Sequence, residues 1–301
     1  MTTRFAITGC RGQLGHALGR QLAADDRSEV VAAVDLPEVD VSDAGAVKRW
    51  FDGLAADVVV NAAAFTHVDR CEREPEAAQR ANAVAPRLLA EACQRDGRQL
   101  VHVSTDYVFA GDADRPYRED DPTGPRTVYG RTKLAGEEAV REVADAFLIV
   151  RTSWVFGRGR NFLAAILAQA EQRRRGQAEG PLRVVDDQRG RPTWAEDLAA
   201  GLRALLEAGA SGLYHLTGGG DVATWWDVAR HCLEAAGHGD LVVERAATSE
   251  LELDAPRPAW SVLDCSKAAA LGVRPRDWRE AVAAYLSSPE SPLTGQTGPG
   301  A

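Results

Sequence analysis

Gly9-Cys10-Arg11-Gly12-Gln13-Leu14-Gly15 is the stretch that decides the fold of this 301-residue chain. The apolar segment 4–8 predicts a buried strand before it, and a helical pattern follows it through Leu22. Strand, Gly-x-x-Gly-x-x-Gly and helix in this order are typical of a dinucleotide-binding unit, because the glycines let the backbone approach a pyrophosphate at the helix N-terminus. The alternative is a glycine-rich turn without a ligand. The predicted cofactor-binding residues here are Gly9, Arg11, Gly12, Gln13, Leu14 and Gly15.

The next strand carries two opposing signals on the choice of cofactor. Residues 29–36 predict a buried parallel strand that ends at Asp35, about 20 residues after the last glycine, where an acid binds the ribose hydroxyls of adenosine and favours NADH. Arg11 could instead reach a 2′-phosphate and favour NADPH, or be a solvated loop residue. The cofactor is therefore predicted as NADH or NADPH. Asp40 and Val41 are predicted at the adenine rim, and Asp43 as a helix cap.

Two further segments are predicted to bring small and polar side chains to one edge of the sheet. Residues 57–61 predict a buried strand, and the small side chains of Ala62-Ala63-Ala64 after it leave room for the cofactor. Residues 99–103 predict the next strand, with the hydroxyls of Ser104 and Thr105 behind it. We expect the carbonyl of a substrate to lie there, although a capping role for these hydroxyls is the alternative.

Tyr129 and Lys133 carry the candidate chemistry. Residues 129–140 are rich in good helix formers, and positions i and i+4 of a helix lie on one face. A nearby ammonium favours the phenolate and lowers a phenol pKa that starts near ~10, so Tyr129 is predicted to exchange a proton near neutral pH. A Tyr-x-x-x-Lys spacing is common by chance. The catalytic interpretation is supported because Thr105 and the glycine loop occur in the same chain.

Composition excludes several classes of protein. A formal charge of −9 and a pI near 5.3 argue against nucleic-acid binding. No apolar run approaches the ~20 residues of a membrane span. The first residues enter a strand, so no signal peptide is expected, and five scattered cysteines without Cys-x-x-Cys spacing are expected to be reduced. These features predict a cytoplasmic protein without a metal-ligand motif.

The fold class expected from this order is α/β, a Rossmann-type doubly wound parallel sheet with a smaller C-terminal α/β lobe. We expect a NAD(P)-binding domain over residues 1–155, to which parts of 180–237 return, a substrate-binding lobe over 156–287, and a disordered tail over 288–301. Pro86 is expected to kink the helix 74–95. Asn82 is expected to be a buried anchor for neighbouring backbone.

Several segments in order along the chain closely resemble dTDP-4-dehydrorhamnose reductases, which are extended short-chain dehydrogenases/reductases. They are residues 61–69, 103–109, 128–137 and 151–156, with shorter matches at 187–193, 214–216 and 257–258. The similarity covers residues 4 to about 286. Trp260-Ser261-Val262 departs from the pattern of many members in a region that would touch the nucleotide or sugar, which leaves the identity of the sugar open.

The resemblance implies reduction of the C4 ketone of dTDP-4-dehydro-6-deoxy-L-mannose to dTDP-L-rhamnose, with hydride from the nicotinamide. In this reading Tyr129 donates a proton to the carbonyl oxygen, Thr105 positions that oxygen, and Lys133 lowers the pKa of Tyr129 and binds the nicotinamide ribose. Trp154 would offer the sugar ring a flat apolar face. The implied substrate-binding residues are Thr66, Val68, Asp69, Thr105, Asp106, Tyr107 and Trp154. Homodimers and bound Mg²⁺ occur among relatives.

Four alternatives stay open beside this reading. Nucleotide-sugar dehydratases carry Thr-Asp-Glu where this chain has Tyr107, a poor base, so a dehydratase is disfavoured. An epimerase uses a similar Thr/Ser, Tyr and Lys set. A 4-ketoreductase for another nucleotide-deoxysugar would carry the same motifs. The regulatory subunit of methionine adenosyltransferase resembles the same family, so the fold alone does not prove catalysis.

Overall fold

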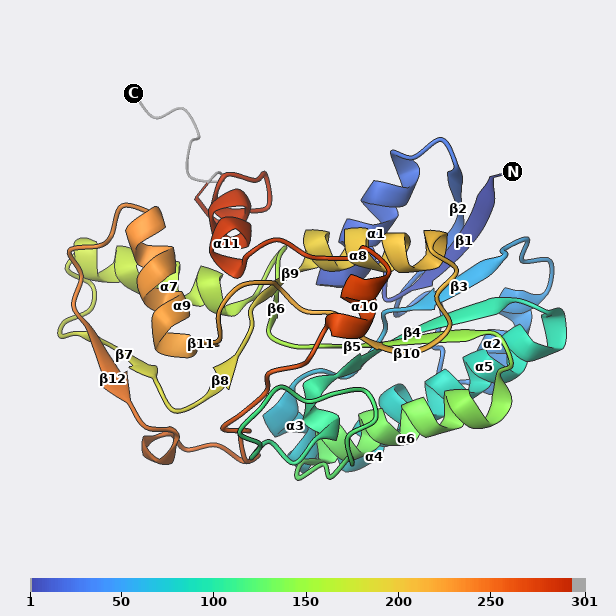
Figure 1. Cartoon of the computed structure of the whole chain (residues 1–301), viewed down its shortest axis with the longest axis horizontal. Helices are drawn as coiled ribbons and strands as arrows, with labels where there is room; N and C mark the ends of the chain where they lie inside the picture. The colour runs from blue at the N-terminus through green and yellow to red at the C-terminus, as the bar shows by residue number, and fades with distance from the viewer. Residues whose placement is uncertain (1, 294–301) are drawn as a thin grey trace.

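The computed structural model describes residues 2–293, which form a large parallel sheet between two helix layers and a smaller lobe beside it (Figure 1). The sheet has six strands in the order β10-β5-β4-β3-β1-β2, and every neighbouring pair is parallel. Its strands are β1 (Thr3–Thr8), β2 (Ser28–Val34), β3 (Val58–Asn61), β4 (Gln99–Thr105), β5 (Phe147–Thr152) and β10 (Gly212–His215). The predicted Rossmann-type sheet is confirmed, and the strand order reverses between β1 and β3, where such sheets bind ligands.

Helices cover both faces of this sheet because both faces are apolar. On one face lie α1 (Gln13–Ala23) and α8 (Ala195–Glu207), which share a buried cluster with Ile7, Val60 and Leu148 of the strands. The opposite face is covered by α2 (Ala44–Phe51), α5 (Ala85–Asp96) and α6 (Val128–Val143). Figure 1 shows α1 and α8 above the sheet and α5 and α6 below it.

The helical region before α5 is irregular, and this irregularity holds two helices close together. The short helices α3 (Val68–Arg73) and α4 (Pro75–Gln79) lead into a π-helical turn, η1 (Arg80–Val84), directly before Pro86. Pro86 has no N–H for the carbonyl of Asn82, as expected for a proline that disrupts helix bonding. In the free space against that carbonyl lies Gly136 of α6, where an added Cβ would stand 2.2 Å from the Asn82 oxygen.

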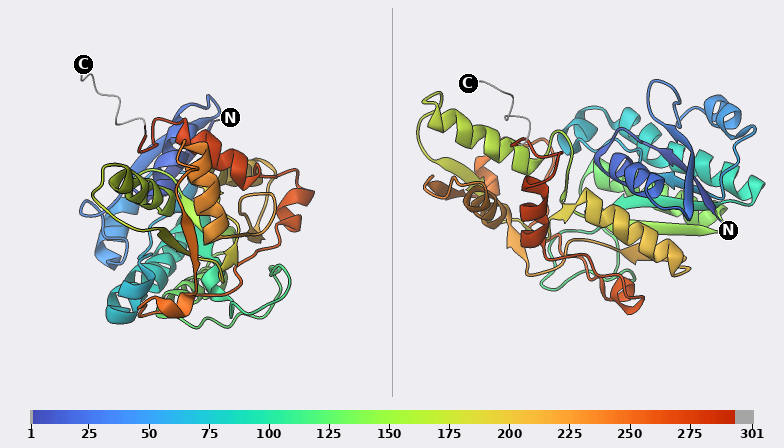
Figure 2. Two further views of the ribbon diagram at one scale, coloured as in Figure 1. Left: turned by 90° about the vertical axis from the view of Figure 1, so that its left-hand side faces the viewer. Right: turned by 90° about the horizontal axis from the view of Figure 1, so that it is seen from above.

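The smaller lobe consists of two-stranded sheets and helices. Its strand pairs are β6 with β9, β7 with β12, and β8 with β11. Figures 1 and 2 show them at the end of the large sheet, with α7, α9 and α11 packed beside them. The bounds of the lobe elements are β6 (Val155–Phe156), α7 (Phe162–Arg174), β7 (Leu182–Val185), β8 (Arg189–Gly190), β9 (Thr193–Trp194), β11 (Ala223–Thr224), α9 (Trp225–Ala235), β12 (Val243–Ala246), η3 (Thr248–Glu250) and α11 (Trp278–Leu286). Two further elements belong to the large sheet: the 3-10 turn η2 (Asp106–Val108) follows β4, and α10 (Ser266–Ala270) packs on the sheet through Ala268.

The chain crosses between the two parts more than once. It leaves the sheet after β5, builds β6 to β9, and returns through α8 and β10, where β10 pairs with β5. We propose the boundary at residues 155/156, with the stretch around α8 and β10 belonging to the first domain. This arrangement leaves the carboxyl ends of β4 and β5 facing the lobe.

The predicted disordered tail needs a correction over its first residues. Ser288 donates its backbone N–H to Tyr285 at 3.0 Å, Ser291 is buried, and Leu293 packs against the cluster around α11. Hydrophobic burial of Leu293 offsets the polar composition that suggested disorder. The rest of the predicted tail, 294–301, lies outside the described residues. Within 2–293, no helix is long and apolar enough to cross a membrane.

Candidate active site

Helix α6 presents Tyr129 and Lys133 to a cavity at the carboxyl ends of β4 and β5. Thr127 caps the helix by accepting from the N–H of Gly130. An added Cβ on Gly130 would stand 2.2 Å from the carbonyl oxygen of Tyr107, so glycine lets the first turn of α6 approach the loop after β4 closely. The helical spacing predicted for Tyr129 and Lys133 is therefore realised, and both side chains line the cavity.

The cavity has a volume of about 500 Å³ and lies between the Rossmann-type sheet and the lobe. The lobe contributes Gln188 and Trp225, and the segment before α10 contributes Arg257 and Ser261. Of the residues predicted for the substrate or for catalysis, those that line it are Thr66, Val68, Thr105, Asp106, Tyr107, Tyr129, Lys133 and Trp154. The structure thus brings together side chains from distant parts of the chain on one concave surface.

Burial dominates the acidity of Tyr129. It raises the pKa of the phenol above its usual range, the nearby Thr105 opposes this effect, and the negative charge of Asp106 reinforces it. The net pKa of Tyr129 is therefore raised and not lowered as the sequence suggested, because burial dominates. The effect of Lys133 on this phenol stays a prediction. A phenol with a raised pKa stays protonated at neutral pH. It can therefore donate this proton to an alkoxide as the alkoxide forms.

Lys133 is buried with 2 % of its surface exposed. Burial lowers the pKa of its ammonium to about 8, while the negative charge of Glu137 raises it. Its Nζ donates to the carbonyl oxygen of Val103 at 2.7 Å and lies 3.5 Å from Nε2 of His102. Glu137 is in turn held by Arg151, whose Nε and Nη2 donate to the two carboxylate oxygens at 2.8 and 2.7 Å. The amine is thus restrained by the carbonyl oxygen of Val103, which also lines the cavity.

Asp106 is a buried carboxyl beside Thr105. Burial raises its pKa to about 6, and the hydroxyls of Ser261 and Thr105 oppose this shift. The Thr105 hydroxyl donates to Oδ1 of Asp106 at 2.9 Å and accepts from the N–H of Tyr107 at 3.2 Å. The second oxygen, Oδ2, is buried and makes no well-formed hydrogen bond, although the Ser261 hydroxyl is near enough to act on the carboxyl. One edge of Asp106 therefore remains for a ligand group.

Asp69 does not line the cavity, which corrects its predicted contact with the sugar. Its carboxylate accepts from the N–H of Ala255 at 3.1 Å and pairs with the guanidinium of Arg257 at 2.5 Å. A carboxylate bound to an arginine is held in place by a charge-assisted hydrogen bond. Asp69 therefore fastens the segment that carries Arg257, and it is Arg257 that faces the cavity.

Trp154 lines the cavity, but its ring is not the free flat surface that was predicted. It stacks on Trp225 with ring centroids 3.8 Å apart and planes 8° apart. On Gly190 an added Cβ would stand 2.5 Å from the ring of Trp154. Its backbone has φ +50°, which a bulky residue seldom adopts and which the packing on Trp225 and Gly190 accompanies. One flat face of Trp154 is therefore covered by Trp225, and Gly190 also packs against the ring.

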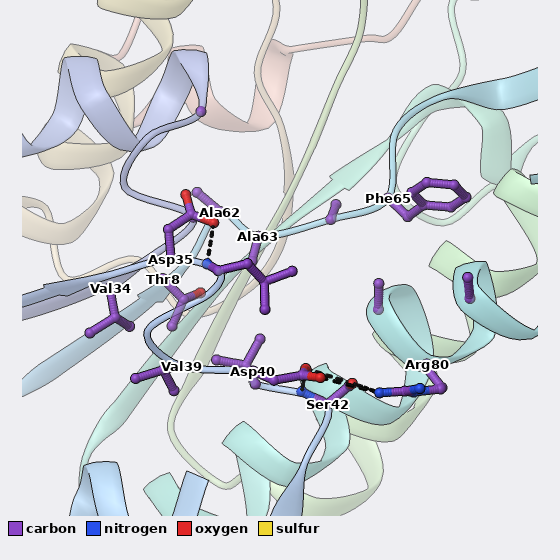
Figure 3. Close-up of a pocket in the computed structure, with 17 residues that line it drawn as sticks. Thr8, Val34, Asp35, Val39, Asp40, Ser42, Ala62, Ala63, Phe65 and Arg80 are labelled. Atoms are coloured by element: carbon purple, nitrogen blue, oxygen red, sulfur yellow. Dashed lines mark hydrogen bonds and ion pairs between the residues drawn. The ribbon is translucent and has the colours of Figure 1, made fainter. Parts of the chain in front are cut away.

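A second cavity of about 460 Å³ runs from the glycine loop along the ends of β1, β2 and β3 (Figure 3). The two cavities share Gly12, Ala62 and Ala64, so they meet at the switch point of the sheet. The predicted cofactor residues on this second surface are Gly9, Gly12, Asp35, Asp40, Val41, Ala62, Ala63 and Ala64. Gln13 and Leu14 line the first cavity, and Arg11 and Gly15 line neither.

The glycine loop has the close packing that a dinucleotide cradle needs. Gly9 has φ +71°, and an added Cβ there would stand 2.5 Å from the N of Ala63. An added Cβ on Gly15 would stand 2.1 Å from the carbonyl oxygen of Gly9. Helix α1 begins after Gly12, and no side chain caps it, so its first N–H groups are available to a pyrophosphate.

The two opposing cofactor signals lie side by side. Asp35 accepts from the backbone N–H groups of Arg11 and Leu36, each at 2.9 Å. The guanidinium of Arg11 donates to the carbonyl oxygen of Leu36 at 2.7 Å and pairs with Glu38. Arg11 is therefore held at the rim with its charge partly neutralised, while Asp35 stands on the cavity wall.

Sequence reasoning missed several residues of the two cavities. Arg80 donates to Asp40 and to the Ser42 hydroxyl, each at 3.2 Å, at one side of the second cavity (Figure 3). Asn82, predicted as an anchor, holds the backbone of Phe65 at 2.8 and 3.1 Å. The neighbouring Asp40-Val41-Ser42 run could have indicated Ser42, but no local pattern indicates Arg80 because the π-helical turn places it.

Unpartnered buried atoms test whether the cavities fit a cofactor and a polar substrate. Among the described residues, the cavity around Tyr129 contains buried side-chain atoms without a hydrogen-bond partner: Oε1 of Gln13 and the hydroxyls of Ser104, Thr152 and Ser261, besides Oδ2 of Asp106. Buried polar groups are normally paired, so this grouping indicates a polar ligand. The uncapped helix and glycine cradle fit a dinucleotide beside it. No cluster of metal-ligating side chains occurs within 2–293.

Comparison with known proteins agrees with this geometry. The family model described as "RmlD substrate binding domain" matches residues 3–290. The dTDP-4-dehydrorhamnose reductase of Streptomyces griseus is 43 % identical over 287 residues, which cover 93 % of this chain and 91 % of the relative. The chain belongs to the dTDP-4-dehydrorhamnose reductase family.

Two further similar proteins concern the identity of the sugar and of the cofactor. A probable dTDP-4,6-dihydroxy-2-methyloxan-3-one 4-ketoreductase of Streptomyces antibioticus is 42 % identical, with 93 % of each chain covered. The crystal structure of dTDP-4-dehydrorhamnose reductase from Bacillus anthracis in complex with NADP is similar with a TM-score of 0.87 and 30 % identity, covering 95 % of this chain and 99 % of that one. The reductase family therefore includes NADP-binding structures and more than one named keto-sugar.

Proposed function

We propose that the protein reduces the C4 ketone of dTDP-4-dehydro-6-deoxy-L-mannose to dTDP-L-rhamnose with NADPH or NADH. The observation that carries the proposal is that Thr105, Tyr129 and Lys133 face one cavity that continues into the dinucleotide cleft at Gly12 and Ala62. Membership of the reductase family supports the same reaction. A sugar nucleotide would extend from the lobe toward the Tyr129 phenol, and a cofactor would lie along the glycine loop.

The residues divide the work of this reaction. The reduced nicotinamide, when bound, supplies the hydride. Tyr129 gives its proton to the sugar oxygen as negative charge develops there, which its raised pKa permits because the alkoxide is a stronger base. Thr105 turns its hydroxyl from Asp106 toward the same oxygen and positions it. Lys133 places its charge beside the phenolate that remains and offers hydrogens to the ribose.

Two features bear on the identity of the sugar. The unpartnered Oδ2 of Asp106 and hydroxyl of Ser261 would meet the hydroxyl groups of a sugar ring, since buried polar atoms demand partners. A 4-ketoreductase for another nucleotide-deoxysugar is the second candidate, favoured by the relative from Streptomyces antibioticus. A homodimer, bound Mg²⁺ and a cytoplasmic location stay predictions of the family resemblance.

A substrate panel tests the proposal. Purified protein is mixed with NADPH or NADH and with several dTDP-4-keto-6-deoxysugars, and each product is identified by NMR. The proposal expects fastest reduction for the L-mannose-derived ketone. Faster turnover of a different keto-sugar would favour the second candidate. Inversion of a ring carbon without net oxidation of the cofactor would favour an epimerase.

A further inference from the structure

A chain of buried polar side chains crosses the sheet and ends at Lys133. Oγ1 of Thr8 on β1 donates to Oδ1 of Asn61 on β3 at 2.8 Å. Nδ2 of Asn61 lies 3.1 Å from Nδ1 of His102 on β4, and Nε2 of His102 lies 3.5 Å from Nζ of Lys133. Asn61 and His102 have 0 % of their surface exposed. Polar groups in the middle of a parallel sheet are costly to bury, so their chain of contacts needs a reason.

The tautomer of His102 follows from the bonds around Asn61. The backbone N–H of Ala63 can only donate, and it lies 3.2 Å from one side-chain atom of Asn61, so that atom is the oxygen. The other atom is the amide nitrogen, which donates to Nδ1 of His102. Because burial and the charge of Lys133 hold the pKa of His102 well below its usual value, the ring is neutral and Nε2 carries its hydrogen.

The N–H of His102 therefore points at the amine of Lys133. A neutral amine accepts that hydrogen, whereas an ammonium has only donors to offer and is repelled. The carbonyl oxygen of Val103 restrains the same amine at 2.7 Å and can accept in either state. His102 thus favours the neutral lysine on the sheet side and turns the charged lysine toward the cavity.

We propose that His102 is a positioning residue for the reductase reaction: Asn61 holds it as the Nε2–H tautomer, and this N–H controls the protonation and direction of Lys133. The inference rests on the proposed function of Lys133. The Asn61 oxygen also accepts from the backbone N–H of Ala63, which lines the cofactor cleft. The series of hydrogen-bonded side chains therefore links the wall of the cleft to the catalytic lysine.

Other charged groups around Lys133 come from each neighbouring element. Glu137, one turn along α6, favours the ammonium form of Lys133. The same carboxylate forms an ion pair with Arg151 of β5. From η2, Asp106 lies near Tyr129 and would favour positive charge in the cavity. His102 is the neutral group from β4, with its Nε2 3.5 Å from the amine. Replacing it isolates one of these effects, because Glu137, Arg151 and Asp106 stay in place.

The tautomer is tested directly by NMR on full-length protein with ¹⁵N-labelled histidine rings. The His102 signals are assigned by their loss in His102→Gln. We expect the Nε2–H tautomer, no protonation of the ring between about pH 6 and pH 10, and a change of the Nε2 shift as Lys133 titrates that disappears in Lys133→Met. An Nδ1–H ring, an imidazolium, or an Nε2 shift that ignores pH would overturn the inference.

A pH profile separates positioning from a merely structural role. His102→Asn keeps an oxygen for Asn61 but has no N–H toward Lys133, and His102→Gln can turn its oxygen to the ammonium. In both variants the apparent pKa of the alkaline limb of the kcat/KM profile should rise by about one unit, and the rise should be larger in His102→Gln. Folded variants with lower kcat and an unmoved limb would contradict the inference. Absence of activity in the parent protein would instead refute the proposed function and leave the NMR result standing.

Discussion

The rings of Trp154 and Trp225 lie 3.8 Å apart in a nearly parallel stack. Trp154 follows the last residues of β5, and Trp225 begins α9 of the lobe, so the stack joins the two parts of the protein at the wall of the cavity. Nε1 of Trp225 also donates to Gln188 at 3.1 Å, which fixes the angle of its ring. The stack is therefore one of the contacts that place the lobe against the cavity, beside the bond from Gln13 to the carbonyl oxygen of Arg160.

Replacing Trp225 with alanine should weaken sugar binding more than cofactor binding. An aromatic pair contributes about 0.5–1.5 kcal/mol beyond buried area, so we expect KM for the keto-sugar to rise by roughly three- to tenfold or more. Trp225→Phe, which keeps a ring, should lose much less. Steady-state kinetics and cofactor titration measure the two effects. An equal rise in the cofactor Kd would mean that the lobe does not bind the sugar separately.

Arg11 and Glu38 should tune the preference between the two cofactors in opposite directions. The hydrogen bond from Arg11 lowers the pKa of Glu38, so the two side chains form an ion pair at the rim of the cleft. Arg11→Ala should lower affinity for NADPH relative to NADH by about tenfold, because a 2′-phosphate loses its cation.

Glu38→Gln is the matched change for this pair, since it frees the guanidinium without removing it. The ratio of the two dissociation constants, measured by cofactor fluorescence, should then shift toward NADPH. If both variants move the ratio the same way, Arg11 does not read the 2′-phosphate.

Asp106 should reduce the stability of the folded protein at neutral pH. Its pKa is about 6 when folded, against 3.8 for an ordinary aspartate, so the folded protein keeps a proton that the unfolded chain releases. Stability therefore falls as pH rises from about 4 to about 6, and a shift of about two units corresponds to about 3 kcal/mol. Asp106→Asn should raise the free energy of unfolding at pH 7 by up to that amount and change little at pH 4. Urea unfolding at both pH values checks this, and a variant less stable than the parent at pH 7 contradicts it.

Gly136→Ala should disturb the site from a distance. The added Cβ would overlap the carbonyl oxygen of Asn82, at 2.2 Å, and overpacking of this kind costs about 1–3 kcal/mol. Asn82 also binds Phe65 and the Thr132 hydroxyl, so the loop beside the cofactor should shift with it.

A second helical glycine provides the control. Gly19→Ala in α1 places its Cβ 3.7 Å from Ile7, which is ordinary contact, and alanine favours helix, so stability should rise by about 0.5–1 kcal/mol. Thermal unfolding compares the two variants. Similar melting temperatures would mean that the space at Gly136 can adjust.

Local sequence patterns predicted the parts of the site that lie on one continuous element. The glycine loop and the Tyr129–Lys133 pair follow from helix and strand geometry, and the structure brings both to the carboxyl edge of the sheet. Patterns did not predict the pairing of Asp69 with Arg257, because 188 residues separate them. The pKa of Tyr129 was predicted in the wrong direction because desolvation depends on packing from several elements.

Contacts between residues far apart in the sequence could not be predicted either. His102 is a polar residue between Val101 and Val103 of β4, and only the tertiary structure places it between Asn61 and Lys133. The stack of Trp154 on Trp225 likewise joins residues that no local pattern connects. Contacts between distant elements are therefore harder to predict than residues that share one helix or loop.

Loss of absorbance at 340 nm on adding dTDP-4-dehydro-6-deoxy-L-mannose, with NADPH and NADH in parallel, tests the central claim most directly. We predict cofactor oxidation by the parent protein and a loss of roughly 10²–10⁴ in rate for Tyr129→Phe, which should still bind the cofactor. No oxidation by folded protein that binds the cofactor, or an undiminished rate in Tyr129→Phe, would contradict the assignment of Tyr129 as the proton donor of a keto-sugar reductase.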